Sequence, residues 1–254
     1  MRALHRQRTA GTAIEVSELS VGYEAVRFSA ERRGFAGLFG FRRHFFPILS
    51  ALSFRISLSG TGAAIIGQNG AGKTTLLRAL SGMIPSRGTI IFNGRSLIQG
   101  TVRERTQYGI IFIPHENGLF PSLSVQEHLR LMAAAQSSIP FIMDRFFSCV
   151  EAINRSLIDS VDFLRHDQKA SNLSGGQKKL LSLIRLLLKP AVLALVDEPT
   201  AGLSPGFIEI VTVLLKMLPC TFFLVAEQYS RINIIQLWDM SIYELGDGTL
   251  CQLK

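Results

Sequence analysis

The alternation of apolar and polar runs along the chain predicts strands that alternate with helices. Short apolar runs occur at residues 63–66, which glycines bound, at 110–113 and at 192–196, and each has the length of a strand buried in a parallel sheet. Helical spacing of apolar residues follows at 74–82 and at 207–218. This order favours an α/β fold with a parallel sheet that helices cover on both faces.

Weaker patterns extend this core. Looser strand patterns at residues 14–21 (ending at Gly22 and Tyr23) and at 52–58 predict a short antiparallel β subdomain on the N-terminal side. Helical spacing dominates from Ser124 onward, so we predict a helical subdomain over about residues 115–185. Further elements are expected as a strand and turn at 89–94, a strand at 221–225, a helix at 230–238 and a hairpin around 246–248.

The composition restricts the class of protein. The 254 residues are 47% hydrophobic and 18% charged, which excludes a mainly disordered chain and allows one domain over residues 1–254. The net charge of +8 favours phosphate-bearing ligands, nucleic acid or an anionic membrane face. Polar residues interrupt the most apolar stretch, and three distant cysteines form no metal or disulfide pattern. We therefore expect a cytosolic protein without membrane spans or a secretory signal.

Residues 67–74 match the phosphate-loop pattern G-x-x-x-x-G-K-[ST] at every fixed position. The loop follows a predicted buried strand and opens a predicted helix, which is the setting that the pattern requires and a chance glycine-rich turn would lack. Successive backbone N–H groups and the helix N-terminus favour phosphate oxygens, the Lys73 ammonium can reach the β and γ phosphates, and the Thr74 hydroxyl can bind Mg²⁺. The predicted nucleotide-binding residues here are Gly67, Gln68, Asn69, Gly70, Ala71, Gly72, Lys73, Thr74 and Thr75.

Two carboxylates, Asp197 and Glu198, follow the apolar run at 192–196. Ligands of parallel sheets bind beyond the carboxyl ends of the strands, so both residues should face the same mouth as Lys73. Asp197 is then a candidate Mg²⁺ ligand, and Glu198 a candidate general base for the water that attacks the γ-phosphate. Adjacent strand residues point to opposite faces, but at a strand end the second can turn into the mouth.

The residues Leu173-Ser174-Gly175-Gly176-Gln177 precede a leucine-rich helix. Alone they read as a Ser N-cap with flexible glycines. Between the phosphate loop and the Asp197-Glu198 strand, however, the chain resembles the nucleotide-binding subunits of ATP-binding-cassette transporters, which carry these three motifs in this order. The resemblance covers about residues 14–250, apart from 27–46. It implies an α/β phosphate-loop nucleotide-binding core with an N-terminal antiparallel β subdomain and a helical subdomain, binding ATP and Mg²⁺.

The resemblance also implies a dimer. Two such domains meet head to tail, and each ATP lies between the phosphate loop of one and the signature (Leu173-Ser174-Gly175-Gly176-Gln177) of the other. Ser174, Gly175, Gly176 and Gln177 would then contact the nucleotide bound to the partner. Tyr23 resembles the family's aromatic residue that stacks on adenine, although a tyrosine packed on the core at a strand end is the other interpretation.

Three positions depart from the common pattern of the family. His115 stands where many relatives have a glutamine, Gln228 where they have a histidine near the γ-phosphate, and Ser204 where they have an aspartate. Gln228 can donate a hydrogen bond but cannot carry a proton. Glu227-Gln228 and the turn Gly202-Leu203-Ser204-Pro205 resemble the ATP-binding subunits of branched-chain amino acid importers and their urea and amide relatives, although His115 stands where those usually have an acidic residue. We therefore expect His115 and Gln228 near the reacting groups with Glu198.

Residues 27–46 form a basic stretch with five arginines and six phenylalanines. Three interpretations are open: a lengthened hairpin with packed Phe and solvated Arg, a contact with a partner or an anionic membrane, and nucleic-acid binding. The last is the weakest, because nucleic-acid readout needs a broader basic array, so no nucleic-acid partner is expected.

The function expected from the resemblance is ATP hydrolysis that drives transport through separate membrane-spanning permease subunits, on the cytoplasmic face of the cell membrane. The expected partners are the permease subunits, a second ATP-binding subunit (a copy or a sister chain) and, in an importer, a substrate-binding protein. Branched-chain amino acid or amide import is one substrate class. The alternatives are an exporter of a lipid-linked polymer and a soluble regulatory ATPase of the same family.

Overall fold

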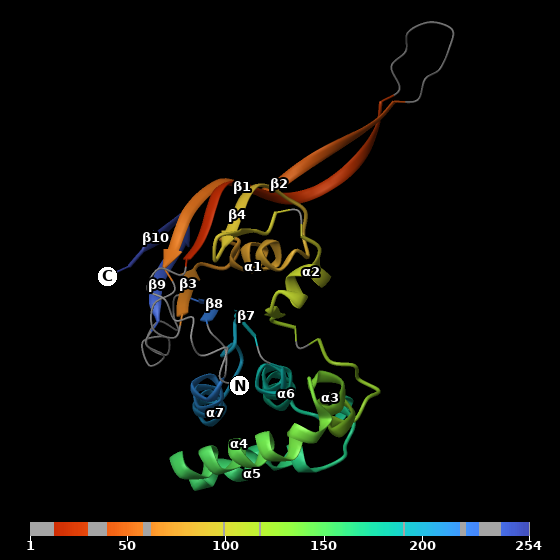
Figure 1. Ribbon diagram of the computed structural model, residues 1–254, viewed down its shortest axis with the longest axis vertical. Helices are drawn as coiled ribbons and strands as arrows, with labels where there is room; N and C mark the ends of the chain where they lie inside the picture. The colour runs from red at the N-terminus through yellow and green to blue at the C-terminus, as the bar shows by residue number, and fades with distance from the viewer. Residues whose placement is uncertain are drawn as a thin grey trace, which may run out of the picture.

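The computed structural model describes residues 13–29, 40–57, 62–98, 100–116, 118–189, 191–218, 222–228 and 240–253. Two β-sheets lie in one part of the molecule with helix α1 (Lys73–Ser81) between them, and a group of helices forms the opposite part (Figure 1). This division agrees with the β subdomain, core and helical subdomain that the sequence predicts.

The larger sheet has the strand order β10-β9-β3-β8-β7-β6. The strand β3 pairs in parallel with both β8 and β9, and β7 pairs in parallel with β6 and β8, while β10 closes the edge as an antiparallel hairpin with β9. The four strands β3, β6, β7 and β8 correspond to predicted strands. The bounds are β3 Gly62–Gly67, β6 Ile110–Ile113, β7 Leu193–Asp197, β8 Phe222–Gln228, β9 Ser241–Gly246 and β10 Thr249–Gln252.

The period of two along β3 divides the hydrophobic core between the two faces of this sheet. Ala63 and Ile65 pack with α1 and the antiparallel sheet, whereas Ala64 and Ile66 pack with the helices on the other face. Every residue of β3 is buried. Burial on both faces explains why this strand reads as a continuous apolar run and why the loop that follows it has a fixed position.

The smaller sheet is antiparallel and has the order β2-β1-β4-β5. Its strands are β1 Ala13–Ser29, β2 Gly40–Ser57, β4 Ser86–Phe92 and β5 Arg95–Ser96. Asn93 and Gly94 both have positive φ and form the predicted turn between β4 and β5. Asp247 and Gly248 do the same between β9 and β10, so the predicted C-terminal hairpin is also present.

The hairpin of β1 and β2 is longer than the sequence predicts. The first strand does not end at Gly22 and Tyr23, because its pairing with β2 continues to Ser29 opposite Gly40. The extended part projects from the molecule as an arm (Figure 1). The described residues of the 27–46 stretch therefore lengthen this hairpin. Its phenylalanines are not all packed down, since Phe45 lies under the Arg87 guanidinium but Phe46 is 46% exposed.

The helical part contains α3 Val125–Met132, α4 Ile139–Ile153 and α5 Ile158–Val161, joined by short 3₁₀ turns. Helix α6 (Gly175–Leu188) and α7 (Pro205–Met217) cover the parallel sheet on this side. The predicted helix at 230–238 lies outside the described residues. Within the described chain, none of the helices combines the length and apolar character that crossing a membrane requires.

A short helix that the sequence analysis missed, α2 (Val102–Gln107), supports α1. Its buried Arg105 donates hydrogen bonds from the guanidinium to four backbone carbonyls, at Ala79, Leu80, Leu97 and Gly100. Two of these carbonyls belong to the last turn of α1, where helix carbonyls lack intrahelical partners. Arg105 thus holds the C-terminal end of the helix whose other end opens with Lys73.

Candidate functional site

The predicted phosphate loop joins β3 to α1, as its motif requires. Gly72, at the N-cap of α1, has φ +96°, and a Cβ there would lie 2.5 Å from Leu49 Cδ2. Only glycine fits both the left-handed backbone and this close approach of β2. The loop therefore holds its position because the antiparallel sheet packs directly against it.

Lys73 is the first residue of α1, and it is 5% exposed. Its ammonium donates to the carbonyl oxygens of Gly67 and Gln68 at 2.8 and 2.9 Å. An ammonium has three donors, and no other partner for it occurs among the described residues. The positive charge is thus held within the loop by the loop itself.

Thr74 faces the end of the neighbouring strand β7. Its hydroxyl lies 3.0 and 2.9 Å from the two carboxylate oxygens of Asp197, to which it donates. Burial raises the pKa of Asp197, and the Thr74 hydrogen bond acts in the opposite direction. A hydroxyl and a carboxylate at this separation form an oxygen-rich pair of the kind that Mg²⁺ prefers.

Glu198 turns into the same mouth as Asp197, as the strand-end argument predicts. It has φ +46°, and this left-handed conformation breaks the alternation of the strand. Its N–H donates to Ala226 O at 2.8 Å. Its carboxylate Oε2 lies 3.6 Å from His115 Nε2 and 3.5 Å from Gln228 Nε2. The three residues that the sequence proposes for the reaction are therefore adjacent.

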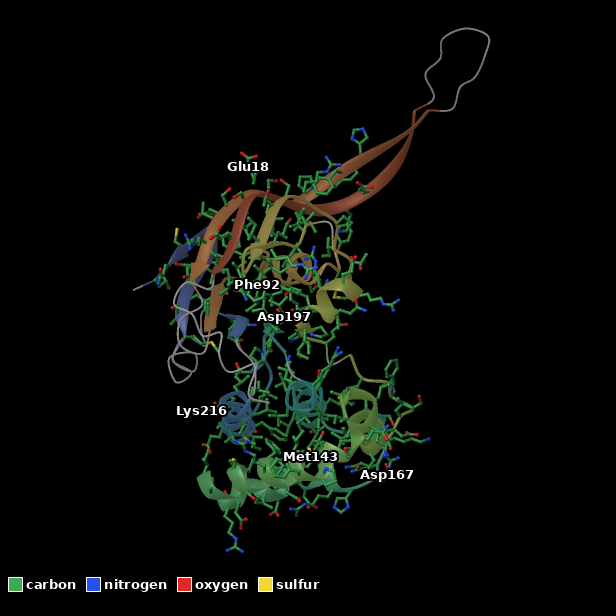
Figure 2. The ribbon with its side chains drawn as sticks, in the orientation of Figure 1. Glu18, Phe92, Met143, Asp167, Asp197 and Lys216 are labelled. Atoms are coloured by element: carbon green, nitrogen blue, oxygen red, sulfur yellow. The ribbon has the colours of Figure 1, made fainter. Side chains whose placement is uncertain are left out.

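These groups line one cavity of about 420 Å³, which also contains Ile48, Arg78 and Glu116. Sequence reasoning did not name Ile48 or Arg78 as lining residues; Arg78 lies one helical turn beyond Thr74, a spacing that marks it as a neighbour. Figure 2 shows Asp197 at the boundary between the sheets and the helices. The full lining is Ile48, Asn69, Gly70, Gly72, Lys73, Thr74, Thr75, Arg78, His115, Glu116, Asp197, Glu198 and Gln228.

Tyr23 is not among these lining residues. It lies on β1 opposite Phe46 and is 55% exposed, so it is not packed on the core either. Ile48, two residues beyond Phe46 on β2, is the side chain of this hairpin that reaches the cavity. The apolar surface formed by Tyr23, Phe46 and Ile48 continues from the phosphate loop along the hairpin.

The signature residues also lie outside this cavity. Ser174 caps α6: its hydroxyl accepts from Gln177 N at 3.2 Å, and Gln177 Oε1 accepts from Ser174 N at 2.9 Å. Ser174 and Gly175 are exposed. A Cβ on Gly176 would come within 3.2 Å of the Phe207 ring, so this glycine permits close packing of α7. The N-terminal turn of α6 is thus capped by Ser174 and exposed at Ser174 and Gly175, the setting in which a helix N-terminus can bind an anion.

Two buried charged residues beside the site, Lys179 and Glu227, were missed by sequence reasoning. Glu227 is fully buried and accepts from the Thr200 hydroxyl at 2.7 Å. Lys179 is 4% exposed on α6 and lies beneath Asp197. A signal existed for Lys179, because Leu183 and Leu186 follow it at helical spacing, which places it on a buried face.

The site residues fit a magnesium nucleotide. Among the described residues no group of three or more His, Cys, Asp and Glu side chains could hold a metal alone. Mg²⁺ typically uses one or two protein oxygens and completes its shell with substrate phosphates and water. The Thr74 hydroxyl and the Asp197 carboxylate supply such oxygens next to the Lys73 loop.

Comparison with known proteins agrees with this geometry. The family model described as ABC transporter matches residues 49–201. A protein of Archaeoglobus fulgidus named "Probable branched-chain amino acid transport ATP-binding protein LivF" is 33% identical over 149 residues, 58% of this chain and 60% of that protein. LivG of the same organism, with the corresponding description, is 30% identical over 220 residues, 81% of this chain and 84% of its own length. The "Cytochrome c biogenesis ATP-binding export protein CcmA" of Xylella fastidiosa is 38% identical over 65% of this chain and 71% of that protein.

Coverage of other relatives is lower. The chain spans 60% of LivF and 35% of the "Ribose import ATP-binding protein RbsA" of Bacillus subtilis, less than two thirds of either.

Solved structures share the fold. An ATP-binding cassette of an ABC transporter in its ADP conformation matches with a TM-score of 0.62 at 21% identity, over 94% of this chain and 89% of that one. A bacterial Atm1-family ABC exporter with ATP bound matches with a TM-score of 0.66 at 20% identity, over 94% of this chain and 38% of that one. The expected α/β fold is confirmed. The chain belongs to the ABC transporter family, whose ATP-binding domains are ATPases.

Proposed function

We propose that this chain is the ATP-binding and ATP-hydrolysing subunit of an ABC transporter. The observation that carries the proposal is the cavity where Lys73, Thr74, Asp197 and Glu198 meet at the carboxyl ends of parallel strands. Phosphoryl transfer needs positioning and charge stabilisation more than covalent chemistry. The loop amides and Lys73 would hold the phosphates, while Thr74 and Asp197 would hold Mg²⁺, which neutralises phosphate charge when bound.

Glu198 is the proposed general base, with His115 and Gln228 beside its carboxylate. It would accept the proton of the attacking water, and a positioned general base typically contributes about 10²–10⁴-fold to rate. Gln228 can donate to the carboxylate or to a phosphate oxygen. Tyr23 is proposed to contact adenine together with the apolar surface that reaches Ile48. Ser174, Gly175, Gly176 and Gln177 are proposed to complete the site of a second ATP-binding subunit.

Membrane-spanning permease subunits are the proposed partners, because two adjoining cavities outside the ATP site form a groove that carries exposed apolar side chains. The cavities, of about 230 and 260 Å³, share Gly118, Met132 and Arg185. Phe120 and Leu131, which line the groove, are 56% and 63% exposed. Large exposed apolar side chains grouped at a groove are typical of a protein interface. A cytoplasmic helix of a permease subunit would dock here, on the cytoplasmic side of the membrane.

Import of branched-chain amino acids or amides is the proposed transport class, with a substrate-binding protein as a further partner. Its support is the pair of relatives with that description and the Glu227-Gln228 pair, whereas His115 departs from the acidic residue usual in that subfamily. Export is the second candidate, supported by the relative described as an export protein. Transport into or out of vesicles with the co-purified membrane subunits separates the two.

Phosphate release from Mg²⁺-ATP tests the proposed activity. Lys73→Ala should abolish nucleotide binding. Glu198→Gln should keep binding but lower hydrolysis by about 100-fold or more and trap an ATP-bound dimer, visible by size-exclusion chromatography. Asp247→Asn, which neutralises an exposed carboxylate in the β9–β10 turn, is the matched control and should hydrolyse normally. Hydrolysis that is unaltered in Glu198→Gln would remove Glu198 from its role, and ATP binding without turnover in the unaltered chain would favour a regulatory module.

Purification of the tagged chain from gently solubilised native membranes tests the proposed partners. Polytopic membrane proteins that co-purify would support the transporter assignment, and a second ATP-binding subunit among them would identify the dimer as one of sister chains. Co-purification of soluble proteins or nucleic acid alone would contradict it.

A further inference from the structure

Lys179 is a buried cation that the proposed reaction does not use. It lies in the second turn of α6, five residues after the Ser174 cap, and it is 4% exposed. Its ammonium donates to His115 O at 3.2 Å and to Asp197 O at 3.1 Å. A lysine is rarely buried unless it is paired or fully hydrogen-bonded, because burying its charge costs free energy. The burial of Lys179 beside the site therefore calls for an explanation.

The two carbonyls that Lys179 binds lie beyond the last pair of residues that joins β6 to β7. The strands β6 and β7 pair in register up to Ile113 opposite Val196. Asp197 directly follows this last pair and still pairs with Ala226 of β8, whereas His115 lies two residues beyond Ile113. Backbone hydrogen bonds of the ladder no longer fix the distance between the two chains there, and Lys179 bridges them instead.

The side chains that follow these carbonyls are those of the reaction. His115 Nε2 lies 3.6 Å from Glu198 Oε2, and Glu198 is adjacent to Asp197 in the chain. A change in the separation of the two strand ends would therefore move His115 relative to Glu198. Misplacement of a reacting group by about 1 Å can lower a rate by about 100-fold.

The charge of Lys179 suits the same place. Burial lowers the pKa of Lys179 to about 8, and the negative charges of Asp197, Glu227 and Glu198 act in the opposite direction, because they favour the charged ammonium. Its charge in turn opposes the rise that burial causes in the pKa of Asp197. A neutral side chain would leave the buried carbonyl of Asp197 and the partly buried carbonyl of His115 without this donor, and the carboxylates without this cation.

We infer that Lys179 is a positioning residue. Its ammonium forms a hydrogen-bonded bridge between the ends of β6 and β7, and this bridge sets the position of His115 relative to Glu198 and Asp197. The inference rests on the proposed function, since it assigns Lys179 to the hydrolysis step at that site. The Lys179 side chain bonds only the backbone carbonyls of His115 and Asp197 and none of the phosphate-loop residues, so it should affect turnover and leave nucleotide affinity unchanged.

Lys179→Met, which keeps the length and removes the donor, is the test. It should lower kcat for ATP hydrolysis by about 10–100-fold, with the Kd of a fluorescent ATP analogue within about two-fold of the unaltered chain. Lys179→Arg keeps a cationic donor and should restore part of kcat. Lys216→Met is the control, since Lys216 is exposed at the end of α7, away from Asp197 (Figure 2), and should change neither quantity. An unchanged kcat in Lys179→Met, or a weakened Kd equal to the loss in turnover, overturns the inference.

Hydrogen exchange separates failure of the inference from failure of the proposed function. If the unaltered chain does not hydrolyse ATP, the proposed function fails. The Lys179 bridge between β6 and β7 is then tested by amide exchange measured without nucleotide. In Lys179→Met the amides of His115, Glu116 and Glu198 should exchange about ten-fold faster, while those of β3 stay protected. Unchanged exchange rates at these amides would refute the inference that the Lys179 bridge holds the two strand ends. If Lys179→Met does not fold, Lys179→Gln, which retains a shorter donor, is measured in the same way with the same criteria.

Discussion

Replacement of Arg105 by methionine should destabilise the fold by an amount that the hydrogen bonds predict. The guanidinium donates to four carbonyls, but two of these keep another partner, since Ala79 O also accepts from Gly82 N and Leu97 O from Gly100 N. Leu80 O and Gly100 O lose the donor that the structure shows for them. An unsatisfied buried carbonyl costs about 1–3 kcal/mol, so the two together cost about 2–6 kcal/mol.

Relief of the buried charge reduces this cost. Burial lowers the pKa of Arg105, which shows that the charged form is disfavoured there, and no carboxylate pairs with it among the described residues. Methionine removes that penalty and keeps most of the side-chain volume. We therefore expect a net loss of about 2–4 kcal/mol in the free energy of unfolding, equivalent to a fall of roughly 5–15 °C in Tm for a chain of this size.

Thermal and urea unfolding measure the effect, with Arg103→Met on the exposed face of α2 as the control. The control should stay within about 0.5 kcal/mol of the unaltered chain. ATP affinity, measured well below the Tm of the variant, should stay unchanged, because Arg105 holds the end of α1 opposite to Lys73. A destabilisation below about 1 kcal/mol, or a stabilisation, would show that the carbonyls find water or other partners and would refute the reasoning.

Two further variants test other parts of the site. Burial raises the pKa of Glu227 above its ordinary 4.5, so the folded state binds the proton more tightly than the unfolded state, and stability should fall as pH rises above about 4.5 until it passes the folded-state pKa. Glu227→Gln should flatten that decline above about pH 4.5 in urea unfolding, and an equally steep decline would contradict it. Ser174→Ala should lose about 1 kcal/mol of stability from the capping box. The rate of ATP hydrolysis by Ser174→Ala should fall by more than the fraction of folded protein falls. If the two losses are equal, Ser174 has a structural role only.

The sequence predicts the phosphate site well because its determinants are local. The apolar run of β3, the glycines and Lys73 adjoin one another, and burial of the strand on both faces follows from the same residues. Glu198 was predicted at the mouth with Asp197, and its positive φ shows how a strand end achieves this.

Other features depend on partners that are distant in the chain. Residues 23–29 of β1 carry little strand pattern, and their pairing exists because 40–46 provides the partner. Helix α2 is short and polar, and its one buried side chain, Arg105, is defined by carbonyls of other segments. Helical spacing can place Lys179 on a buried face, but its hydrogen-bond partners at the ends of β6 and β7 are defined only by the fold.

The central position of β3 has a consequence for synthesis of the chain on the ribosome. The strand that presents the phosphate loop has β8 on one side and β9 on the other, and Gly62 pairs with a residue about 160 positions later. A growing chain that has not yet reached residue 246 therefore leaves this apolar strand with an open edge. The ATP site is incomplete on such an intermediate. The unpaired edge of β3 is the kind of surface that chaperones bind. The order in which the strands are made thus delays nucleotide binding until nearly all of this fold has been translated.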